Sequence, residues 1–137
     1  MSHDLAFFAH VDGLTEEQIR SAYRAYCEGT TADSGVASSI LTAFVERLES
    51  RYPQLSDLNE EELDSSPWSA EFDRGPTHLI ICMAFSRAVD VGQYILDLLQ
   101  SHPLIVYDPQ ADQAFFGPQR LPLARPVAPR QSWKFWK

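Results

Sequence analysis

Residues 78–85 read His-Leu-Ile-Ile-Cys-Met-Ala-Phe, and Leu79 to Phe85 is the longest unbroken apolar run in the chain. The run follows the Gly75-Pro76 turn and precedes Ser86, which suits the start of a helix. A run this short cannot cross a membrane. Its length and its apolar character predict the central strand of a sheet.

Two further segments complete the centre and one edge of the predicted sheet. Residues 4–9 (Asp-Leu-Ala-Phe-Phe-Ala) form a short apolar run that predicts a strand buried on both faces. Residues 70–74 carry Glu71 and Asp73, which suits an edge strand protected by charge. We also expect strands over 104–107 and 114–116, joined by a turn in which Asp108 acts as an Asx-type turn former.

Three amphipathic helices are predicted between these strands. The first begins at Thr15, where Gln18 completes a capping box, and ends at Gly29. The second begins near Ser38 and ends before Pro53, and the third begins at Ser86 and ends at His102-Pro103. Each has apolar residues at the helical spacing that buries one face.

The resulting order is β-α-α-β-β-α-β-(β). If the second helix is an insertion, this is the split βαβ pattern of ferredoxin-like sheets. Right-handed crossovers then place the first and third strands in the centre and the charged strand at an edge. We predict an α+β fold with an antiparallel sheet, helices on one face and an inserted second helix.

The 137 residues suffice for one domain, which we place at 1–119, followed by a Pro-rich, basic and aromatic segment at 120–137. The formal net charge is −8, yet the last segment has five basic residues and no acidic one. The acidic domain disfavours direct binding to nucleic acid and would attract a basic partner. Acidity of this kind also serves solubility alone.

A search for catalytic and metal-binding patterns predicts neither an enzyme nor a cofactor. The chain lacks a Walker loop, a dinucleotide fingerprint, Gly-x-Ser-x-Gly, His-x-x-x-His and Cys-x-x-Cys. Cys27 and Cys82 lie on apolar faces and resemble core residues rather than a disulfide or a nucleophile. With no secretory signal or membrane span, we expect a cytoplasmic protein.

A cluster of acidic residues follows the second helix. Residues 57–64 lack the spacing of a calcium loop, so we consider either a solvated loop or an anionic patch that docks into a basic cleft. Trp68 could anchor that interface or cap the core. The predicted partner-binding residues are Asp57, Glu60, Glu61, Glu62, Asp64 and Trp68.

The segment 120–137 ends in Trp133-Lys134-Phe135-Trp136-Lys137. Three aromatic residues in five should not remain in water. We expect Trp133, Phe135 and Trp136 to dock on the protein's own surface or on a second copy, rather than on a membrane.

Four segments of the chain resemble a diffuse group of bacterial proteins. They are Met-Ser-His-Asp-Leu (1–5), Ser-Arg-Tyr-Pro-Gln-Leu (50–55), Ile-Ile-Cys-Met-Ala-Phe-Ser-Arg-Ala (80–88) and Leu-Ile-Val-Tyr-Asp-Pro-Gln (104–110). These proteins are small, are often encoded beside polymorphic toxins and resemble immunity proteins. The resemblance spans about residues 1–118, and the group more often has Tyr at position 3 and Trp at position 85.

The resemblance implies an immunity protein that binds and occludes a cognate antibacterial toxin without catalysis. The acidic surface makes a basic, nuclease-like toxin the expected partner. The alternative is a ferredoxin-like ligand-binding or regulatory module, which could form a homodimer through an open sheet face. This alternative predicts a pocket between the sheet and the helices.

Overall fold

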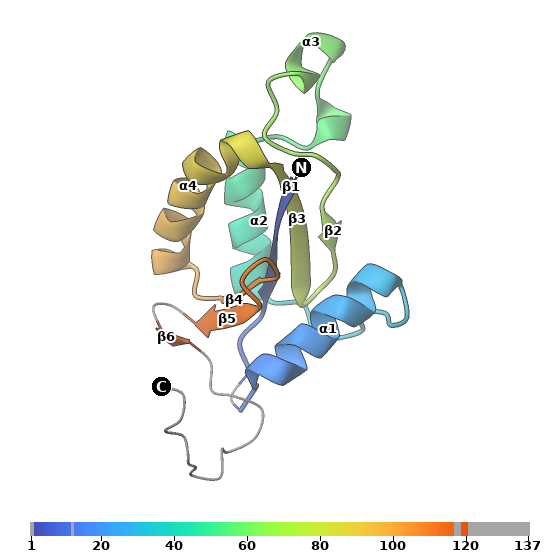
Figure 1. Cartoon of the computed structure of the whole chain (residues 1–137), viewed down its shortest axis with the longest axis vertical. Coiled ribbons are helices and arrows are strands. Elements are labelled where there is room, and N and C mark those ends of the chain that lie inside the picture. Colours follow the sequence, from blue (N-terminus) through green and yellow to red (C-terminus); the bar gives the residue numbers. More distant parts are fainter. Residues whose placement is uncertain (1, 12, 117–118, 121–137) are drawn as a thin grey trace.

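A computed structural model describes residues 2–11, 13–116 and 119–120 of the chain (Figure 1). Its strands are β1 (Ser2–Phe8), β2 (Asp73–Arg74), β3 (His78–Ala84), β4 (Ile105–Asp108), β5 (Gln113–Phe116) and β6 (Gln119–Arg120). Its α-helices are α1 (Glu16–Glu28), α2 (Ser39–Arg51), α3 (Glu60–Leu63) and α4 (Ala88–Ser101), and two short 3-10 turns cover Leu55–Asp57 and Phe85–Arg87.

The strands form an open antiparallel sheet in the order β2-β3-β1-β4-β5-β6. The predicted central strands are adjacent, and their pairing runs from Ser2 opposite Ala84 to Phe8 opposite His78. The charged strand β2 lies at one edge. The α+β class, the antiparallel sheet and these strand positions are therefore confirmed.

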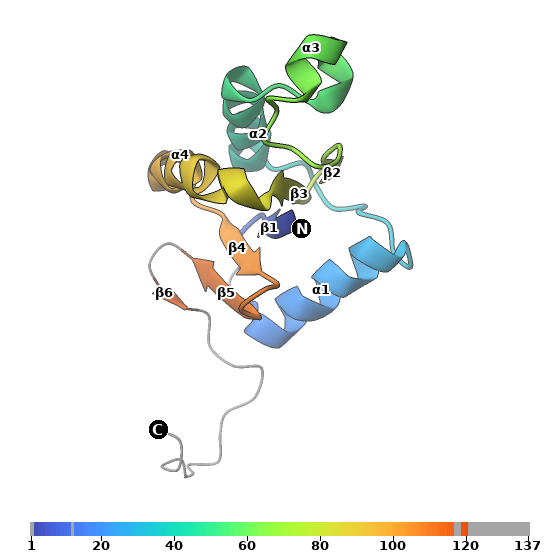
Figure 2. The ribbon, with the colours of Figure 1, turned by 45° about the horizontal axis from the view of Figure 1, so that its top comes forward.

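The helices cover both faces of the sheet, so the prediction that they share one face is wrong (Figure 2). On one face, α2 and α4 pack over Phe7, Leu79 and Ile81. On the other face, Ile19 of α1 packs with Phe8 and residues of β3, β4 and β5. The reason is that the central strands are apolar on both faces, and each face needs cover to exclude water.

The helix ends follow the sequence closely, with one exception. Thr15 caps α1 through the predicted capping box, and Gly29 ends it in the left-handed conformation at φ 70°. Ser38 caps α2 by accepting a hydrogen bond from the Leu41 amide. Ser86, however, does not cap α4, because residues 85–87 form a 3-10 turn and the helix begins after Arg87.

Candidate partner-binding surface

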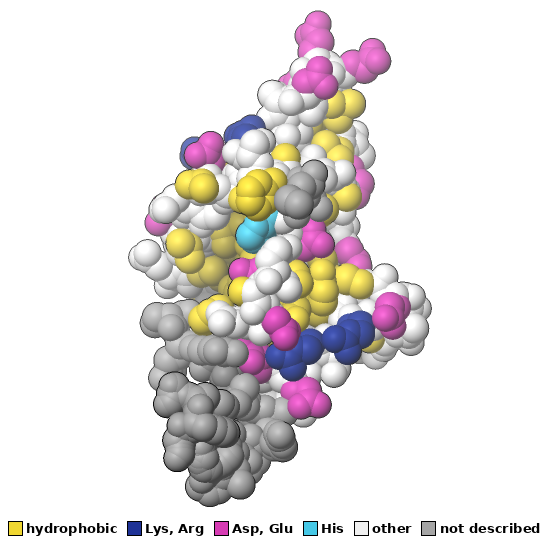
Figure 3. All heavy atoms as spheres, viewed as in Figure 1, with side chains coloured by type: hydrophobic (Ala, Val, Ile, Leu, Met, Phe, Trp, Pro, Cys, Tyr) yellow, Lys and Arg dark blue, Asp and Glu magenta, His cyan; other side chains and the backbone are white. Residues whose placement is uncertain are grey.

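The acidic segment stands at one end of the molecule. Its two short turns, Leu55–Asp57 and Glu60–Leu63, project beyond α2 and the sheet (Figure 1). The five acidic residues predicted for this site are all exposed, namely Asp57, Glu60, Glu61, Glu62 and Asp64. Acidic side chains stand out at this end of the surface (Figure 3). We call residues 55–64 the acidic projection.

The acidic projection is held by specific hydrogen bonds. Asn59 and Glu62 form a capping box, in which each side chain accepts from the other residue's backbone amide at 2.9 and 3.0 Å. The Glu71 carboxylate accepts from the Ser56 amide at 2.6 Å, and Arg87 donates to the Ser65 carbonyl at 2.9 Å. These contacts order the loop, and an ordered loop loses less conformational entropy when it binds than a disordered one does.

The carboxylates at the tip are available for a partner. Within the described part of the chain, none of the five acidic residues forms an ion pair. The Glu62 carboxylate already accepts a hydrogen bond from the Asn59 amide. The carboxylates of Glu60 and Glu61 are therefore the ones best able to pair with an added cation. Arg51 and Arg87 line a small hollow of about 210 Å³ at the base of the acidic projection. The basic side chains therefore lie at the base, and the tip carries acidic ones.

Trp68 is not a surface anchor, and its assignment to the interface is corrected. Its side chain is 4% exposed and belongs to the core under α2 and α4. The indole Nε1–H donates to the Tyr52 carbonyl at 2.9 Å, and the ring meets Phe72 edge-on at 4.9 Å between centroids. Burial of the large ring and of its donor explains why the tryptophan caps the core instead.

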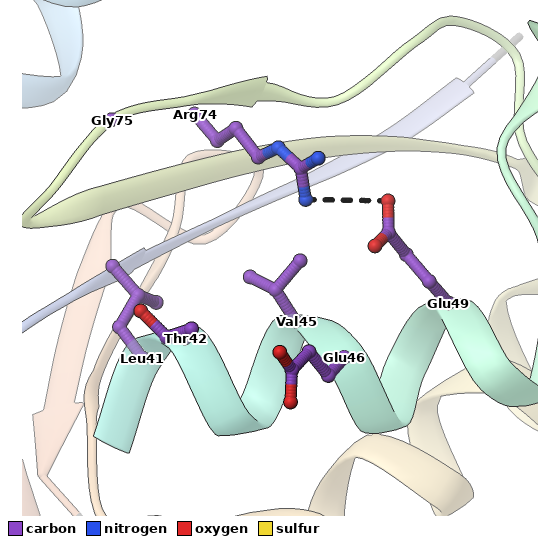
Figure 4. Close-up of a pocket in the computed structure, with 7 residues that line it drawn as sticks. All are labelled: Leu41, Thr42, Val45, Glu46, Glu49, Arg74 and Gly75. Carbon is purple, nitrogen blue, oxygen red and sulfur yellow. Dashed lines mark hydrogen bonds and ion pairs between the residues drawn. The ribbon is translucent and has the colours of Figure 1, made fainter. Parts of the chain in front are cut away.

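A second acidic feature, which sequence reasoning missed, lies between α2 and β2 (Figure 4). The depression has a volume of about 340 Å³ and is lined by Leu41, Val45, Glu46, Glu49 and Arg74, among others. Arg74 donates to Glu49 at 3.2 Å. The signal in the sequence was the pair of acidic residues three positions apart on the polar face of α2.

The buried cluster around His78 resembles the His–Asp pair of a catalytic site, but each ring nitrogen of His78 contacts a carboxylate. The ring is 4% exposed, stacks on Tyr26 at 3.9 Å, and contacts Asp33 through Nδ1 at 2.7 Å and Asp73 through Nε2 at 3.3 Å. Because both nitrogens face carboxylates, neither is left to accept a proton from a nucleophile. The sequence predicts that His78 begins the central strand, as it does, but it did not predict these contacts.

A polar cluster joins α1 to the β4–β5 turn. Asp112 accepts from the Arg20 guanidinium and from the Tyr107 hydroxyl, each at 2.6 Å. Burial, together with the bond to Asp112, raises the pKa of Tyr107 to about 12. Asp108 forms the predicted Asx turn by accepting from the Gln110 amide at 3.0 Å. The cluster fixes the turn and leaves Tyr107 protonated at neutral pH.

The cysteines differ from the prediction in one respect. No disulfide joins Cys27 to Cys82, but Cys27 is exposed rather than part of the core, and Cys82 is half-buried. Among the residues with described positions, no group of three or more His, Cys, Asp or Glu side chains could hold a metal ion. Over the same residues, no helix has the length and apolar character needed to cross a bilayer.

The predicted docking residues Trp133, Phe135 and Trp136 lie outside the described residues. Comparisons with family models, curated proteins and solved structures find no match to this chain.

Proposed function

We propose that the protein is an immunity protein, which binds a cognate antibacterial toxin and occludes it without doing chemistry. The expected toxin is basic and nuclease-like, and the acidic projection is the part that meets it. In this proposal the protein acts in the cytoplasm and does not itself bind nucleic acid.

The observation that supports this proposal is the combination of order and free charge in the acidic projection. Glu60 and Glu61 extend from a turn that Asn59, Ser56 and Arg87 hold in place. Preorganised carboxylates can pair with Lys and Arg in a basic cleft, and they accelerate the encounter through long-range attraction.

The experiment compares two charge reversals of equal size. Glu60→Lys with Glu61→Lys changes the tip and keeps the capping residues Asn59 and Glu62. Glu28→Lys with Asp97→Lys makes the same change in net charge at exposed positions on α1 and α4. Each variant is co-expressed with the toxin that this proposal expects to find encoded beside the gene. The proposal requires that only the tip variant fails to protect the cells.

We further propose that β2-β3-β1-β4 with α2 and α4 form a ferredoxin-like split βαβ unit. The order and antiparallel pairing of these strands support this. In that arrangement α1, rather than α2, is the inserted helix, and β5 and β6 extend the sheet.

The alternative function is a ligand-binding or regulatory module, including a homodimer. A groove of about 540 Å³ between α4 and the sheet favours it, because this is the place where the alternative predicted a pocket. A metabolite that fits the groove would raise the unfolding temperature. Protection from a toxin and stabilisation by a metabolite are separate measurements, so the two functions are distinguishable.

A further inference from the structure

The groove between α4 and the sheet has a volume of about 540 Å³ and a mostly apolar lining. Its floor includes Leu5 of β1, Val106 of β4 and Phe115 of β5. These three strands are neighbours in the sheet, and Val106 pairs directly with Phe115. A hollow of this size and composition is typical of a site for a small molecule.

The α4 wall of the groove presents apolar side chains to solvent. Val89 is 76% exposed and Leu96 is 59% exposed, and they lie two turns apart on one side of the helix. Gly92 lies between them and also lines the groove. Apolar side chains are visible at the surface over α4 (Figure 3). A ligand that covers these side chains would remove apolar surface from water, which favours its binding.

The groove is bordered by one carboxylate, that of Asp108. Ala6 of β1 pairs with Tyr107 of β4, so Leu5 and Asp108 are the next residues along the two strands. The other polar residue of the lining is Gln93, which is uncharged. The groove therefore combines an apolar floor with a single negative charge.

The two carboxylate oxygens of Asp108 differ in their contacts. Oδ1 accepts from the Gln110 amide at 3.0 Å, from Nε2 of Gln110 at 2.6 Å and from the Ala111 amide at 3.4 Å. Nε2 of His3 also lies 4.0 Å from Oδ1. Among the residues that the structure describes, none forms a hydrogen bond or an ion pair with Oδ2. The Asx turn thus fixes the carboxylate through one oxygen, and the other can accept from a ligand.

We propose that the groove between α4 and the sheet is a binding site for small amphipathic amines. The apolar body of the ligand lies on Leu5, Val106 and Phe115, and its ammonium group donates to Oδ2 of Asp108. The inference rests on the alternative function given above and names its class of ligand. It is independent of the toxin proposal, because the acidic projection does not line the groove.

Charge favours an amine over other apolar ligands. A ligand with a carboxylate would bring a second negative charge to Asp108, and like charges at close range repel. A neutral hydroxyl can donate to Oδ2, but a hydrogen bond between two charged groups is stronger than one with a neutral donor. The apolar floor beside the carboxylate lowers the local dielectric and strengthens the attraction further.

The test titrates the full chain with three probes that share one body and differ in the end group. 4-Phenylbutylamine carries an ammonium group, 4-phenylbutanol a hydroxyl and 4-phenylbutyrate a carboxylate. Amide chemical shifts in proton–nitrogen NMR spectra at pH 8 report both the affinity and the place of binding. We expect the amine to shift the amides of Val89, Gly92 and Val106. It should bind about tenfold more tightly than the alcohol, and the acid should bind most weakly.

Three variants test the two parts of the site. Asp108→Asn removes the charge but keeps an oxygen that can form the Asx turn, so it should reduce the affinity for the amine to that for the alcohol. Asp97→Asn is the matched control, because it makes the same change of charge at an exposed position of α4 outside the lining. It should keep the preference for the amine. Gly92→Leu should block all three probes, and the fold accepts it because a Cβ there meets no other atom within 4 Å.

Four results would overturn the inference. Equal affinity for the amine and the alcohol would show that the ligand need not be cationic, and would leave a ligand-binding function in place. No shift with the amine would remove the site itself. Amine binding that persists in Gly92→Leu would place the ligand elsewhere on the acidic surface. Shifts at Val89 and Leu96 that follow the protein concentration, and not the probe, would make a second copy the occupant.

Discussion

Oδ2 of Asp33 and Nδ1 of His78 lie 2.7 Å apart, although 45 residues separate them in the sequence. Because an ionised carboxylate can only accept, Nδ1 carries the hydrogen in this contact. Asp33 also accepts from the amide and the hydroxyl of Thr77, each at 2.7 Å, and from the Gly35 amide at 3.2 Å. The contact ties the connection between α1 and α2 to the start of β3.

Acid should weaken this contact. Burial of Asp33 opposes its ionisation, but the bonds from His78, Thr77 and Gly35 outweigh that effect and lower its pKa from 3.8 to about 2. A pKa that is lower in the folded chain means that the carboxylate stabilises the fold above pH 3.8 and loses this contribution as the pH falls toward 2. We expect Asp33→Asn to lower the free energy of unfolding at pH 7 by about 2 kcal/mol. Urea denaturation between pH 7 and pH 2 measures this, and an equal loss at every pH would contradict it.

Gly75 should be intolerant of a methyl group. A Cβ at this position would lie 2.7 Å from Oδ2 and 2.8 Å from Cβ of Asp33, and 2.9 Å from Cε1 of His78. We expect Gly75→Ala to lower the free energy of unfolding by about 1–3 kcal/mol through overpacking. Gly92→Ala is the control, because it adds a methyl group in open space within a helix and should raise stability by up to about 1 kcal/mol. Thermal unfolding of both variants measures the difference. Similar melting temperatures for the two variants would refute the close approach of Gly75 to Asp33 and His78.

Trp68 should matter for stability and not for partner binding. Trp68→Phe leaves part of the ring site empty and removes the donor to the Tyr52 carbonyl, so we expect a loss on the order of 2 kcal/mol. Phe85→Leu, at a side chain that is 59% exposed, should change stability by less than about 0.5 kcal/mol. Chemical denaturation and toxin binding are measured on the same samples. A stable Trp68→Phe variant that fails to bind would return Trp68 to the interface.

The side chain of Gln110 should replace the strand-to-strand hydrogen bonds that β1 lacks beyond the end of its pairing with β4. Its side-chain amide donates to the Asp4 carbonyl and accepts from the Asp4 amide, both at 2.9 Å, where β4 no longer pairs with β1. We expect Gln110→Ala to cost about 1 kcal/mol and to speed hydrogen exchange at the Asp4 amide. Gln100→Ala, at an exposed site near the end of α4, should leave that amide unchanged. Unaltered exchange in Gln110→Ala would disprove the role.

The sequence predicts the sheet well because its signals are local. The apolar runs at 4–9 and 78–85 mark β1 and β3, and Thr15 and Gly29 mark the ends of α1. The placement of α1 could not be predicted in this way. Its apolar stripe shows that one side of the helix is buried. It does not show which face of the sheet the helix covers, because the central strands are apolar on both faces.

The site was predictable in part, for a related reason. Charge alone indicates that residues 57–64 are exposed, because unpaired carboxylates are costly to bury. The hydrogen bonds that hold the acidic projection join residues far apart in the chain, such as Ser56 with Glu71 and Ser65 with Arg87. The burial of Trp68 and the pairing of Asp33 with His78 likewise depend on the folded arrangement.

The most direct test of the central claim measures toxin affinity by calorimetry at low and at physiological salt. The account predicts that reversing Glu60 and Glu61 weakens binding on the order of 100-fold and reduces its salt dependence, since close charge pairs are worth several kcal/mol. The reversal of Glu28 and Asp97 should change affinity less than about threefold, as expected for charges outside the contact area. Equal affinity of the Glu60/Glu61 variant and the unmodified protein would contradict the claim that the acidic projection binds the toxin.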